Sequence, residues 1–271
     1  MTLADPTNPF EPAFRFDLDG RSIVASRLDG ADPNLPFVLF VHGAAMDRSV
    51  WTAQLHDLAK LGYGALAVDL PGHGESEGPA LAGIGALGHW LARYVFSLAP
   101  PFAGRRVVLC GHSMGSLAAL AAAAELSDRL AGLVLIGSAA RMRVNAKLLA
   151  AAQAQEPTTA DLIAKWSLSP DAPDGLRQAA CTLIRKGIAV LGTDLAACDD
   201  FTETESLAER IACPVILLSG EADRMTPPAE AARLATVFPE ARLVLRPETG
   251  HMVMQEDPVA TTELIVGLIR I

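Results

Sequence analysis

Ser113 is the residue whose surroundings point most directly to chemistry. It is the centre of the pentapeptide GHSMG at residues 111–115, which follows the apolar run 107–110 and precedes the alanine- and leucine-rich segment 116–126. A buried strand, a sharp turn and a helix are the context that lifts a serine to the tip of a sheet as a nucleophile. Glycines are expected two positions before and after the serine, because side chains there would collide with the neighbouring strand and helix. The pattern therefore predicts nucleophilic catalysis by Ser113.

A serine nucleophile needs a base that takes its proton, and histidine is the side chain suited to this at neutral pH. The chain has six histidines. His251 stands just after the last apolar run, so it is expected on a loop at the same edge of the sheet as Ser113. The other five, for which helical positions or structural roles are expected, are His42, His56, His73, His89 and His112. His251 is therefore the predicted base.

A histidine base is in turn oriented by a carboxylate. Two acidic residues, Glu221 and Asp223, follow the penultimate apolar run at the same edge of the predicted sheet. Either could serve, but Asp223 is favoured because it lies further into the loop, closer to a histidine that arrives from the next strand. No acidic residue directly follows the run that ends near Gly137, which removes the main alternative location. The predicted chain order is serine, aspartate, histidine.

Negative charge on a reacting carbonyl oxygen is stabilised by backbone N–H groups that point at it. One donor is expected from Met114, the residue after the nucleophile. A second is expected from the loop after the apolar run 37–41, where Gly43 lets the chain turn tightly. The N–H of Ala44 is the predicted donor in that loop.

Four residues near the predicted catalytic groups are candidates for contact with a substrate. Met225 and Met252 adjoin the acid and the base, and flexible thioether side chains readily line an apolar pocket. Arg141 and Arg143 lie a few residues after the apolar run 133–136 and could hold a substrate carboxylate. Ordinary packing of the methionines and a solvated surface for the arginines are the competing interpretations.

The catalytic candidates all follow short apolar runs, which alternate along the chain with helical patterns. Continuous apolar runs indicate strands buried on both faces, and their alternation with helices indicates a parallel sheet covered on each side. Before them, the segments 14–18 and 22–26 alternate in polarity around Asp19-Gly20, which predicts an antiparallel hairpin. The expected fold is α/β, with an eight-stranded, mostly parallel sheet and helices on both faces. The runs are 37–41, 65–68, 107–110, 133–136, 215–218 and 243–245.

Helices are expected between these strands. Thr226 precedes two prolines and Asp257 precedes one, so both residues are expected to cap the helices that follow them. The expected helices are 50–61, 81–98, 227–237 and 258–271.

About seventy residues without a strand pattern separate the runs near 137 and 213, which is longer than an ordinary connection. We therefore predict that residues 141–201 form a helical cap over the sheet, inserted between two parts of a core, 1–140 and 202–271. Within the whole stretch between residues 137 and 213, helices are expected at 148–155, 160–166, 176–190 and 206–211. Helix breakers are expected at Pro157, Pro170, Pro173 and Gly192.

Composition narrows the partners and the compartment. Hydrophobic residues make up 51% of the 271 residues, and the net charge of −9 argues against a nucleic-acid partner, whose phosphates would be repelled. The first residues lack the pattern of a secretory signal, and no uninterrupted apolar stretch of about 18 residues is present to span a membrane. The four cysteines show no C-x-x-C spacing and are expected to be reduced, so a cytoplasmic protein without a metal site is predicted.

Taken together, the motifs resemble the α/β-hydrolase family, and within it the capped bacterial esterases, lactonases and carbon–carbon bond hydrolases. In the family's order they are HG at 42–43, DLPGHGES at 69–76, GHSMG at 111–115, GEAD at 220–223 and GH at 250–251. They cover most of the chain. The resemblance implies a catalytic triad of Ser113, Asp223 and His251, no cofactor, and a substrate pocket between the sheet and the cap.

Related enzymes with other nucleophiles fit less well. Haloalkane dehalogenases and epoxide hydrolases resemble this pattern but carry an aspartate where the chain has Ser113. Epoxide hydrolases also use cap tyrosines, whereas Tyr63 and Tyr94 lie outside the predicted cap. The leading hypothesis is therefore a carboxylic-ester hydrolase that acts on small to medium, mostly apolar small molecules through an acyl-enzyme on Ser113.

Two alternatives remain. The first is a lactonase or a hydrolase of vinylogous diketones, in which Arg141 or Arg143 would bind a substrate carboxylate. His112 argues mildly against the diketone hydrolases, which resemble a pattern with asparagine before the serine. The second is a ligand receptor of the same fold that keeps the triad without turnover.

Overall fold

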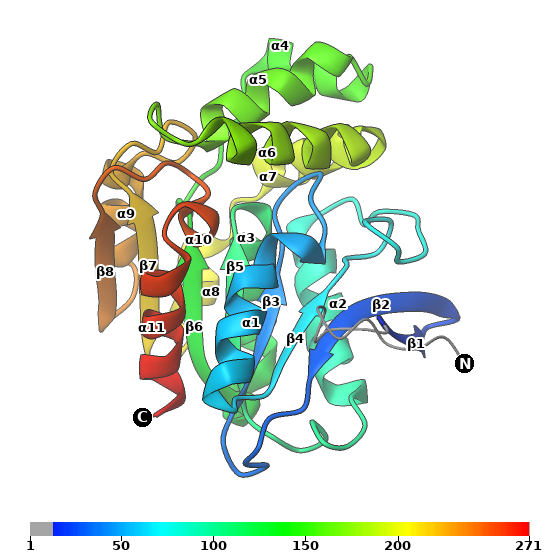
Figure 1. Ribbon diagram of the computed structural model, residues 1–271, viewed down its shortest axis with the longest axis vertical. Helices are drawn as coiled ribbons and strands as arrows, with labels where there is room; N and C mark the ends of the chain where they lie inside the picture. The colour runs from blue at the N-terminus through cyan, green and yellow to red at the C-terminus, as the bar shows by residue number, and fades with distance from the viewer. Residues whose placement is uncertain (1–12, 271) are drawn as a thin grey trace.

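The computed structural model describes residues 13–270, in which one eight-stranded sheet runs between layers of helices (Figure 1). The strand order is β1-β2-β4-β3-β5-β6-β7-β8. β2 is antiparallel to both of its neighbours, and the remaining pairs are parallel, which confirms the predicted α/β fold. The strands are β1 (Phe14–Leu18), β2 (Arg21–Leu28), β3 (Phe37–Val41), β4 (Ala65–Val68), β5 (Val107–His112), β6 (Leu130–Ile136), β7 (Val215–Gly220) and β8 (Ala241–Arg246).

The β1–β2 hairpin turns at Asp19 and Gly20, whose φ angles are 59° and 75°. A two-residue turn with positive φ at both positions matches the twist of the strands, and Asp-Gly favours it. Leu18 pairs with Arg21 across this turn, so the predicted hairpin is confirmed.

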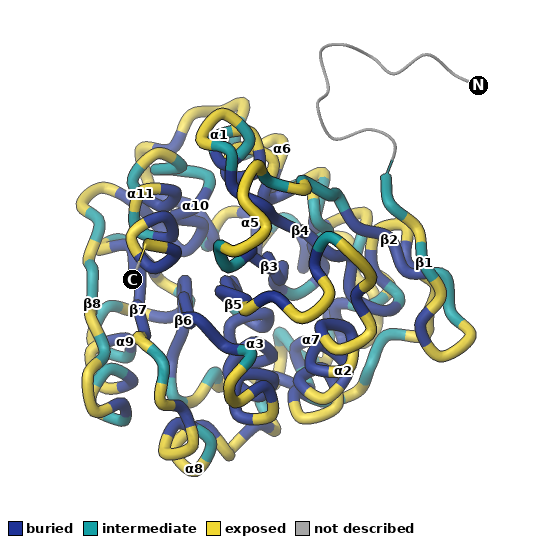
Figure 2. The backbone as a smooth tube through the Cα atoms, turned by 90° about the horizontal axis from the view of Figure 1, so that it is seen from below, coloured by how far each residue is buried: buried dark blue, intermediate teal, exposed yellow. Residues whose placement is uncertain are grey.

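The central strands are buried along their length (Figure 2), and their alternate residues belong to two separate core clusters. In β3, Phe37, Leu39 and Val41 belong to a core cluster that includes residues of the helices at 84–97 and 114–126. Val38 and Phe40 belong to a second cluster that includes residues of the helices at 52–61 and 258–269. Burial on both faces explains why this strand is apolar throughout. The helices outside the long β6–β7 connection are α1 (Thr52–Leu61), α2 (Ile84–Ser97), α3 (Met114–Leu126), α8 (Thr204–Ala208), α9 (Pro228–Ala235), α10 (Val253–Glu256) and α11 (Pro258–Ile269), with 3-10 turns at Arg48–Trp51 and Ser127–Arg129.

The central parallel strands end close to one another. Val41 of β3 pairs with Gly111 of β5, and His112 of β5 pairs with Ile136 of β6. Since parallel strands in register end at the same edge, the loops that follow β3, β5, β7 and β8 all emerge there. In open α/β sheets this carboxyl edge is where ligands bind.

Four helices of the connection between β6 and β7 lie over this edge of the sheet (Figure 1). We call residues 146–200 the helical insert. The single helix predicted over 176–190 is wrong: two helices meet at Gly187 instead. Gly192, predicted as a breaker, lies inside α7, where a Cβ would come 2.8 Å from the backbone of Gln153, so glycine permits close packing of α4 and α7. The insert helices are α4 (Ala146–Gln153), α5 (Pro157–Ser167), α6 (Asp174–Lys186) and α7 (Ile188–Asp200).

One of the two predicted helix caps is confirmed. The side chain of Asp257 accepts a hydrogen bond from Ala260 N–H at 3.2 Å at the start of α11. Thr226 does not cap α9, whose N-cap is Pro227. The Thr226 hydroxyl donates to Asp223 instead, because the loop after β7 turns this side chain toward the carboxyl edge.

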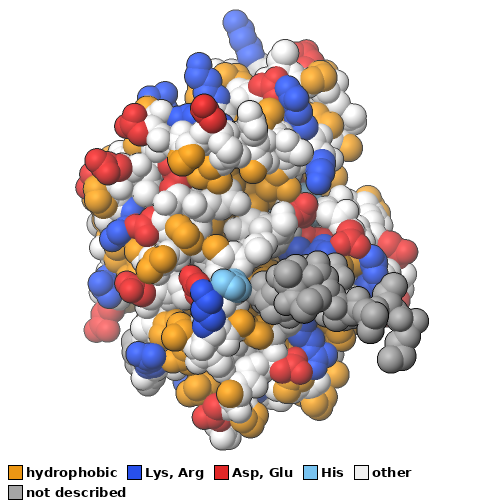
Figure 3. Space-filling model, in the orientation of Figure 1, with side chains coloured by type: hydrophobic (Ala, Val, Ile, Leu, Met, Phe, Trp, Pro, Cys, Tyr) orange, Lys and Arg blue, Asp and Glu red, His pale blue; other side chains and the backbone are white. Residues whose placement is uncertain are grey.

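The surface charge, the helix lengths and the cysteines give three further observations. Acidic and basic side chains are interspersed on the face drawn in Figure 3, with no extended basic patch on that face. Within residues 13–270, no helix has the length and apolar character needed to cross a bilayer. All four cysteines are free thiols, two of them buried.

Candidate active site

Ser113 is the single residue between β5 and α3, with φ 53° and ψ −122°. A non-glycine residue in this region is strained, and such strain persists only where the surroundings over-determine it. Here the serine N–H donates to Ile136 O at 2.9 Å. A Cβ on Gly111 would lie 2.2 Å from Gly115 O, and one on Gly115 would lie 2.3 Å from His42 O. Both glycines are therefore required by the turn, which presents Ser113 at the positive N-terminal end of α3.

Asp223 after β7 and His251 after β8 meet in a buried hydrogen bond. His251 Nδ1 donates to Asp223 Oδ2 at 2.8 Å, and the two side chains are 1% and 0% exposed. The other carboxylate oxygen accepts from the N–H groups of Met225 and Thr226. Burial raises the pKa of Asp223, but the charge of His251 and the donated hydrogen bonds outweigh burial and hold the pKa below its ordinary value. The ionised carboxylate therefore fixes the proton of His251 on Nδ1.

The structure distinguishes the two carboxylates that the sequence left open. Glu221 is exposed at the first position after β7, whereas Asp223 is buried. The N–H of Ala222 donates to Thr249 O at 2.9 Å, which joins the loop after β7 to the loop before His251. Asp223 is thus the residue that reaches the ring.

The other ring nitrogen of His251, Nε2, is buried and has no hydrogen-bond partner among the described residues. His251 and Ser113 line the same cavity, of about 230 Å³, although no hydrogen bond joins their side chains within residues 13–270. A base with one nitrogen held by a carboxylate and the other free is arranged to accept a proton from a hydroxyl group.

Two backbone N–H groups lie next to the nucleophile, those of Ala44 and Met114, and neither donates a hydrogen bond in the described part of the chain. Met114 is the first residue of α3, directly after Ser113. Ala44 lines the cavity, and the preceding Gly43 lies so close to the nucleophile that a Cβ on it would be 3.2 Å from Ser113 Cβ. Their closeness to Ser113 makes the N–H groups of Ala44 and Met114 the candidate donors to the oxygen of a carbonyl bound to Ser113.

Two of the four residues predicted to contact substrate line the cavity. Arg143 and Met225 do so, whereas Arg141 and Met252 do not. Arg141 donates to Phe201 O at 3.5 Å, and Met252 is fully buried in the core with α1 and α11. Apolar side chains dominate the rest of the wall, which includes Met46, Met142, Val144, Leu148, Ile163, Trp166, Leu191, Leu195 and Cys198.

Two supporting residues were not predicted from the sequence. The Thr226 hydroxyl donates to Asp223 Oδ2 at 2.7 Å and lies 3.1 Å from His251 Nδ1. Its position three residues after the acid, typical of an aspartate turn, is a signal that could have found it. His112 Nε2 donates to His251 O at 3.1 Å, and burial lowers the pKa of His112 well below its ordinary value, so this ring stays neutral.

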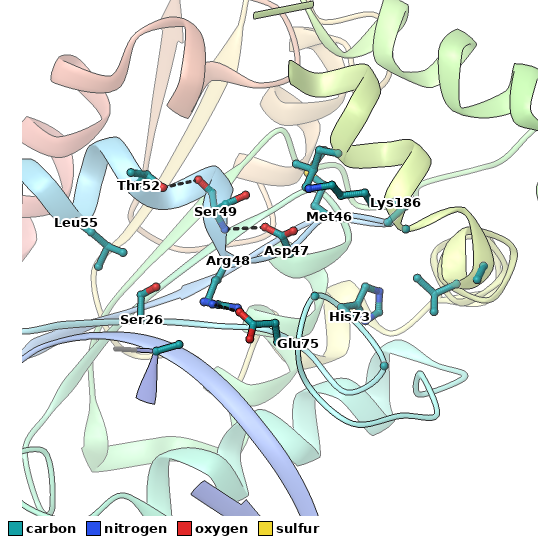
Figure 4. Close-up of a pocket in the computed structure, with 18 of the residues that line it drawn as sticks. Ser26, Met46, Asp47, Arg48, Ser49, Thr52, Leu55, His73, Glu75 and Lys186 are labelled. Carbon is teal, nitrogen blue, oxygen red and sulfur yellow. Dashed lines mark hydrogen bonds and ion pairs between the residues drawn. The ribbon is translucent and has the colours of Figure 1, made fainter. Parts of the chain in front are cut away.

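A larger hollow of about 820 Å³ lies between the insert and the loops after β3 and β4 (Figure 4). Its charges are largely paired: Arg48 bonds to Asp69 and Glu75, and Arg15 bonds to Glu75. It lacks Ser113 and His251. The smaller cavity, where the nucleophile and base meet, is therefore the candidate active site.

His73, on the wall of the larger hollow, forms a buried pair with Asp194 of α7. His73 Nδ1 donates to Pro71 O at 3.0 Å, and Nε2 lies 2.9 Å from Asp194 Oδ2. Burial lowers the pKa of His73, but Asp194 and the Pro71 carbonyl outweigh burial and raise the pKa above 6.5. The other titratable groups facing the ring are His42, with ring centroids 5.0 Å apart, and Asp69.

This pair predicts how stability depends on pH. A raised folded-state pKa contributes stability that is complete below the unfolded pKa of about 6.5 and is lost as pH rises through the folded value. The free energy of unfolding, measured with urea between pH 6 and 9, should therefore fall more in the wild type than in His73→Gln. His56→Gln, which changes an exposed histidine of α1, is the matched control and should keep the wild-type slope. Equal slopes in wild type and His73→Gln would contradict the prediction.

Comparisons of the sequence with a family profile and with known proteins agree on one family. The sequence profile described as the alpha/beta hydrolase family matches residues 38–264. The chain is 28% identical over 259 residues to a pimeloyl-[acyl-carrier protein] methyl ester esterase of Aromatoleum aromaticum, covering 88% of this chain and 99% of that one. It is also 27% identical over 238 residues to protein ABHD8 of Bos taurus, covering 84% of this chain but 54% of the relative. The chain thus spans about half the length of the ABHD8 proteins it matches.

A solved structure shares the architecture. The enol-lactonase of Burkholderia xenovorans LB400 superposes with a TM-score of 0.81 at 24% identity, covering 95% of this chain and all of that one. At this identity the likeness concerns the fold.

Proposed function

The chain belongs to the alpha/beta hydrolase family, and from this premise we propose that it is a serine hydrolase of carboxylic esters. Its substrates are small to medium, mostly apolar molecules, and the reaction passes through an acyl-enzyme on Ser113. The observation that carries the proposal is the state of His251: Nδ1 is bonded to buried Asp223, and Nε2 is buried, unpartnered within the described residues, and on the wall that holds Ser113.

The proposed chemistry begins when Ser113 Oγ attacks the ester carbonyl and His251 Nε2 takes the hydroxyl proton. The carbonyl oxygen becomes an oxyanion that accepts hydrogen bonds from the N–H groups of Ala44 and Met114. Collapse of the tetrahedral intermediate breaks the bond to the alcohol oxygen, which leaves with the proton from His251. Water then repeats the sequence on the acyl-enzyme, releasing the acid and restoring the serine.

The cavity favours a small acyl group. Its volume of about 230 Å³ is below the range of roughly 300–1,000 Å³ that drug-sized ligand pockets occupy. Helices α4, α5 and α7 supply most of its apolar wall through residues such as Leu148, Ile163 and Leu191. We therefore propose that residues 141–201 act as a cap whose apolar side chains select the acyl chain.

Hydrolysis of p-nitrophenyl esters of increasing acyl length tests this function. Turnover should be fastest for short chains such as acetate or butyrate and should fall for long chains that the cavity cannot hold. A fluorophosphonate should then inactivate the enzyme by displacement of its fluoride by Ser113 Oγ. Mass spectrometry of the digested protein should find one label per chain, on the peptide that contains Ser113. A label on another residue, or ester turnover that survives complete labelling, would overturn the proposal.

A second candidate is a lactonase or another hydrolase of acidic substrates, and two arginines favour it. Arg143 and Arg224 line the cavity, and neither has a hydrogen-bond or ion-pair partner within residues 13–270. No acidic side chain lines this cavity, although the chain carries a net charge of −9. Substrates with a carboxylate near the reacting carbonyl would therefore meet positive charge that no protein group neutralises.

Arg143→Gln is expected to raise KM about 10-fold or more for the p-nitrophenyl monoester of a dicarboxylic acid, since a hydrogen bond to a charged group contributes about 1.5–3 kcal/mol. KM for p-nitrophenyl butyrate should stay within about twofold of the wild type, because that ester has no charge to pair. Arg141→Gln is the matched control, since Arg141 lies outside the cavity wall and donates to Phe201 O. A parallel rise for both esters would indicate loss of packing rather than of charge recognition.

A further inference from the structure

Asp194 of α7 is a buried carboxylate that the proposed ester hydrolysis does not use directly. Its side chain is 1% exposed. Oδ2 accepts a hydrogen bond from Ala45 N–H at 2.8 Å and lies 2.9 Å from His73 Nε2. Its two partners lie in the loops after β3 and β4, so one oxygen of the helical insert joins two loops of the sheet's carboxyl edge. A buried charge persists where such partners compensate its desolvation.

The insert bonds to the N–H of Ala45 and packs closely against its carbonyl. Asp194 accepts from the N–H, and Gly187 lies so close to the carbonyl that a Cβ on it would be 2.2 Å from Ala45 O. Gly187 immediately precedes α7, and Asp194 lies two helical turns further along, so both are on the same side of this helix. Ala45 itself has φ 55°, a left-handed conformation that is uncommon for alanine and needs such support.

The peptide before Ala44 is held from the other side. Gly43 O accepts from His42 Nδ1–H at 2.9 Å and from Met46 N–H at 3.3 Å. His42 Nε2 accepts from Leu70 N–H, and burial lowers the pKa of His42 to about 3, so the ring stays neutral with its proton on Nδ1. In a trans peptide the N–H points opposite to the C=O, so these donors direct the Ala44 N–H away from themselves.

Ala44 therefore lies between two fixed peptides, and we propose that Asp194 is a positioning residue for the oxyanion hole. By holding the N–H of Ala45, it fixes the backbone of Ala44 so that the Ala44 N–H points at the carbonyl oxygen of a substrate on Ser113. His73 keeps the carboxylate in place. The role rests on the proposed function, and it makes the insert part of transition-state stabilisation as well as part of the cavity wall. Donors oriented before the reaction need no reorganisation when charge develops.

The test compares Asp194→Ala and Asp194→Asn with the wild type, with kcat expressed per active site titrated by a fluorophosphonate. Loss of one oxyanion donor lowers kcat by about 10²–10³-fold, so a misdirected donor in Asp194→Ala is expected to lower kcat about 10- to 100-fold with KM within about twofold. The amide oxygen in Asp194→Asn can still accept from Ala45 N–H and should restore most of kcat. Asp200→Asn is the matched control: Asp200 is also on α7, but its side chain is exposed and it does not line the cavity.

A trifluoromethyl ketone gives the second readout. Ser113 Oγ adds to its carbonyl, the hydroxyl proton passes to His251, and the ketone oxygen becomes an oxyanion in the same hole. Its inhibition constant should therefore rise in Asp194→Ala in proportion to the fall in kcat. A role in folding alone would reduce the number of titrated sites but leave kcat per site and the inhibition constant unchanged, and that result would overturn the proposal for Asp194. A wild type that neither hydrolyses esters nor binds the ketone would instead refute the proposed function, and the role of Asp194 with it.

Discussion

Ser113→Ala is expected to lower kcat for ester hydrolysis by on the order of 10⁵-fold or more, because no other group can form the acyl-enzyme. His251 and the two backbone N–H donors remain in this variant, so the activity left over reports what they contribute to attack by water. The substitution removes a hydroxyl that makes no hydrogen bond within residues 13–270. Alanine also meets the same backbone strain at φ 53°.

Thermal unfolding should therefore differ little between Ser113→Ala and the wild type, which separates loss of chemistry from loss of folding. The measurement is kcat on p-nitrophenyl butyrate beside a melting curve for each protein. Ser206→Ala is the control, since Ser206 is exposed in α8 and its hydroxyl donates to Glu203 O, a local contact far from the site. Turnover that survives in Ser113→Ala at a comparable rate would mean that another residue is the nucleophile.

Asp223→Asn is expected to lower kcat by about 10⁴-fold, because an amide cannot stabilise His251 as it becomes positively charged and favours the wrong tautomer. In the wild type the Asp223 carboxylate accepts four hydrogen bonds, from two N–H groups, a hydroxyl and the His251 ring, so an amide in its place is poorly matched to its neighbours. An amide nitrogen would have to face at least one of these donors. The folded protein should therefore also lose stability, by about 1–3 kcal/mol for a buried group left unsatisfied.

The measurement for Asp223→Asn is kcat together with urea unfolding at pH 7, where the wild-type carboxylate is ionised. Glu221→Gln provides the matched control: it removes a carboxylate two residues away in the same loop, but one that is exposed. Its kcat should stay within about twofold of the wild type, as is usual for an exposed group outside the site. If Glu221→Gln were the more damaging substitution, the assignment of the acid would be wrong.

Local patterns were sufficient to predict the architecture. The apolar runs at 37–41 and 65–68 are strands with the same bounds in the structure, because burial on both faces of a parallel sheet requires continuous apolar residues. The Asp19-Gly20 hairpin and the Asp257 cap were predictable for a similar reason, since both depend on residues within a few positions of each other. The family, predicted from motifs in their order, is confirmed.

Predictions failed where a side chain's orientation or its packing partners are set by the surrounding fold. Gly192 was expected to break a helix, but it lies inside α7 because α4 packs against it. Thr226 was expected to cap a helix, but its hydroxyl serves Asp223 and His251. Arg141 and Arg143 are two residues apart in the chain, yet only Arg143 lines the cavity.

The sequence by itself therefore determined the strands, the strained turn at Ser113 and the order of the candidate catalytic groups, because spacing and residue type act through the nearby backbone. The tertiary structure decided that Asp223 rather than Glu221 meets His251, and that Asp194 of the insert holds Ala45, 149 residues earlier in the chain. Such contacts follow from how helices and loops pack on the sheet. Packing depends on the summed shape and burial of many side chains, which no short stretch of sequence contains.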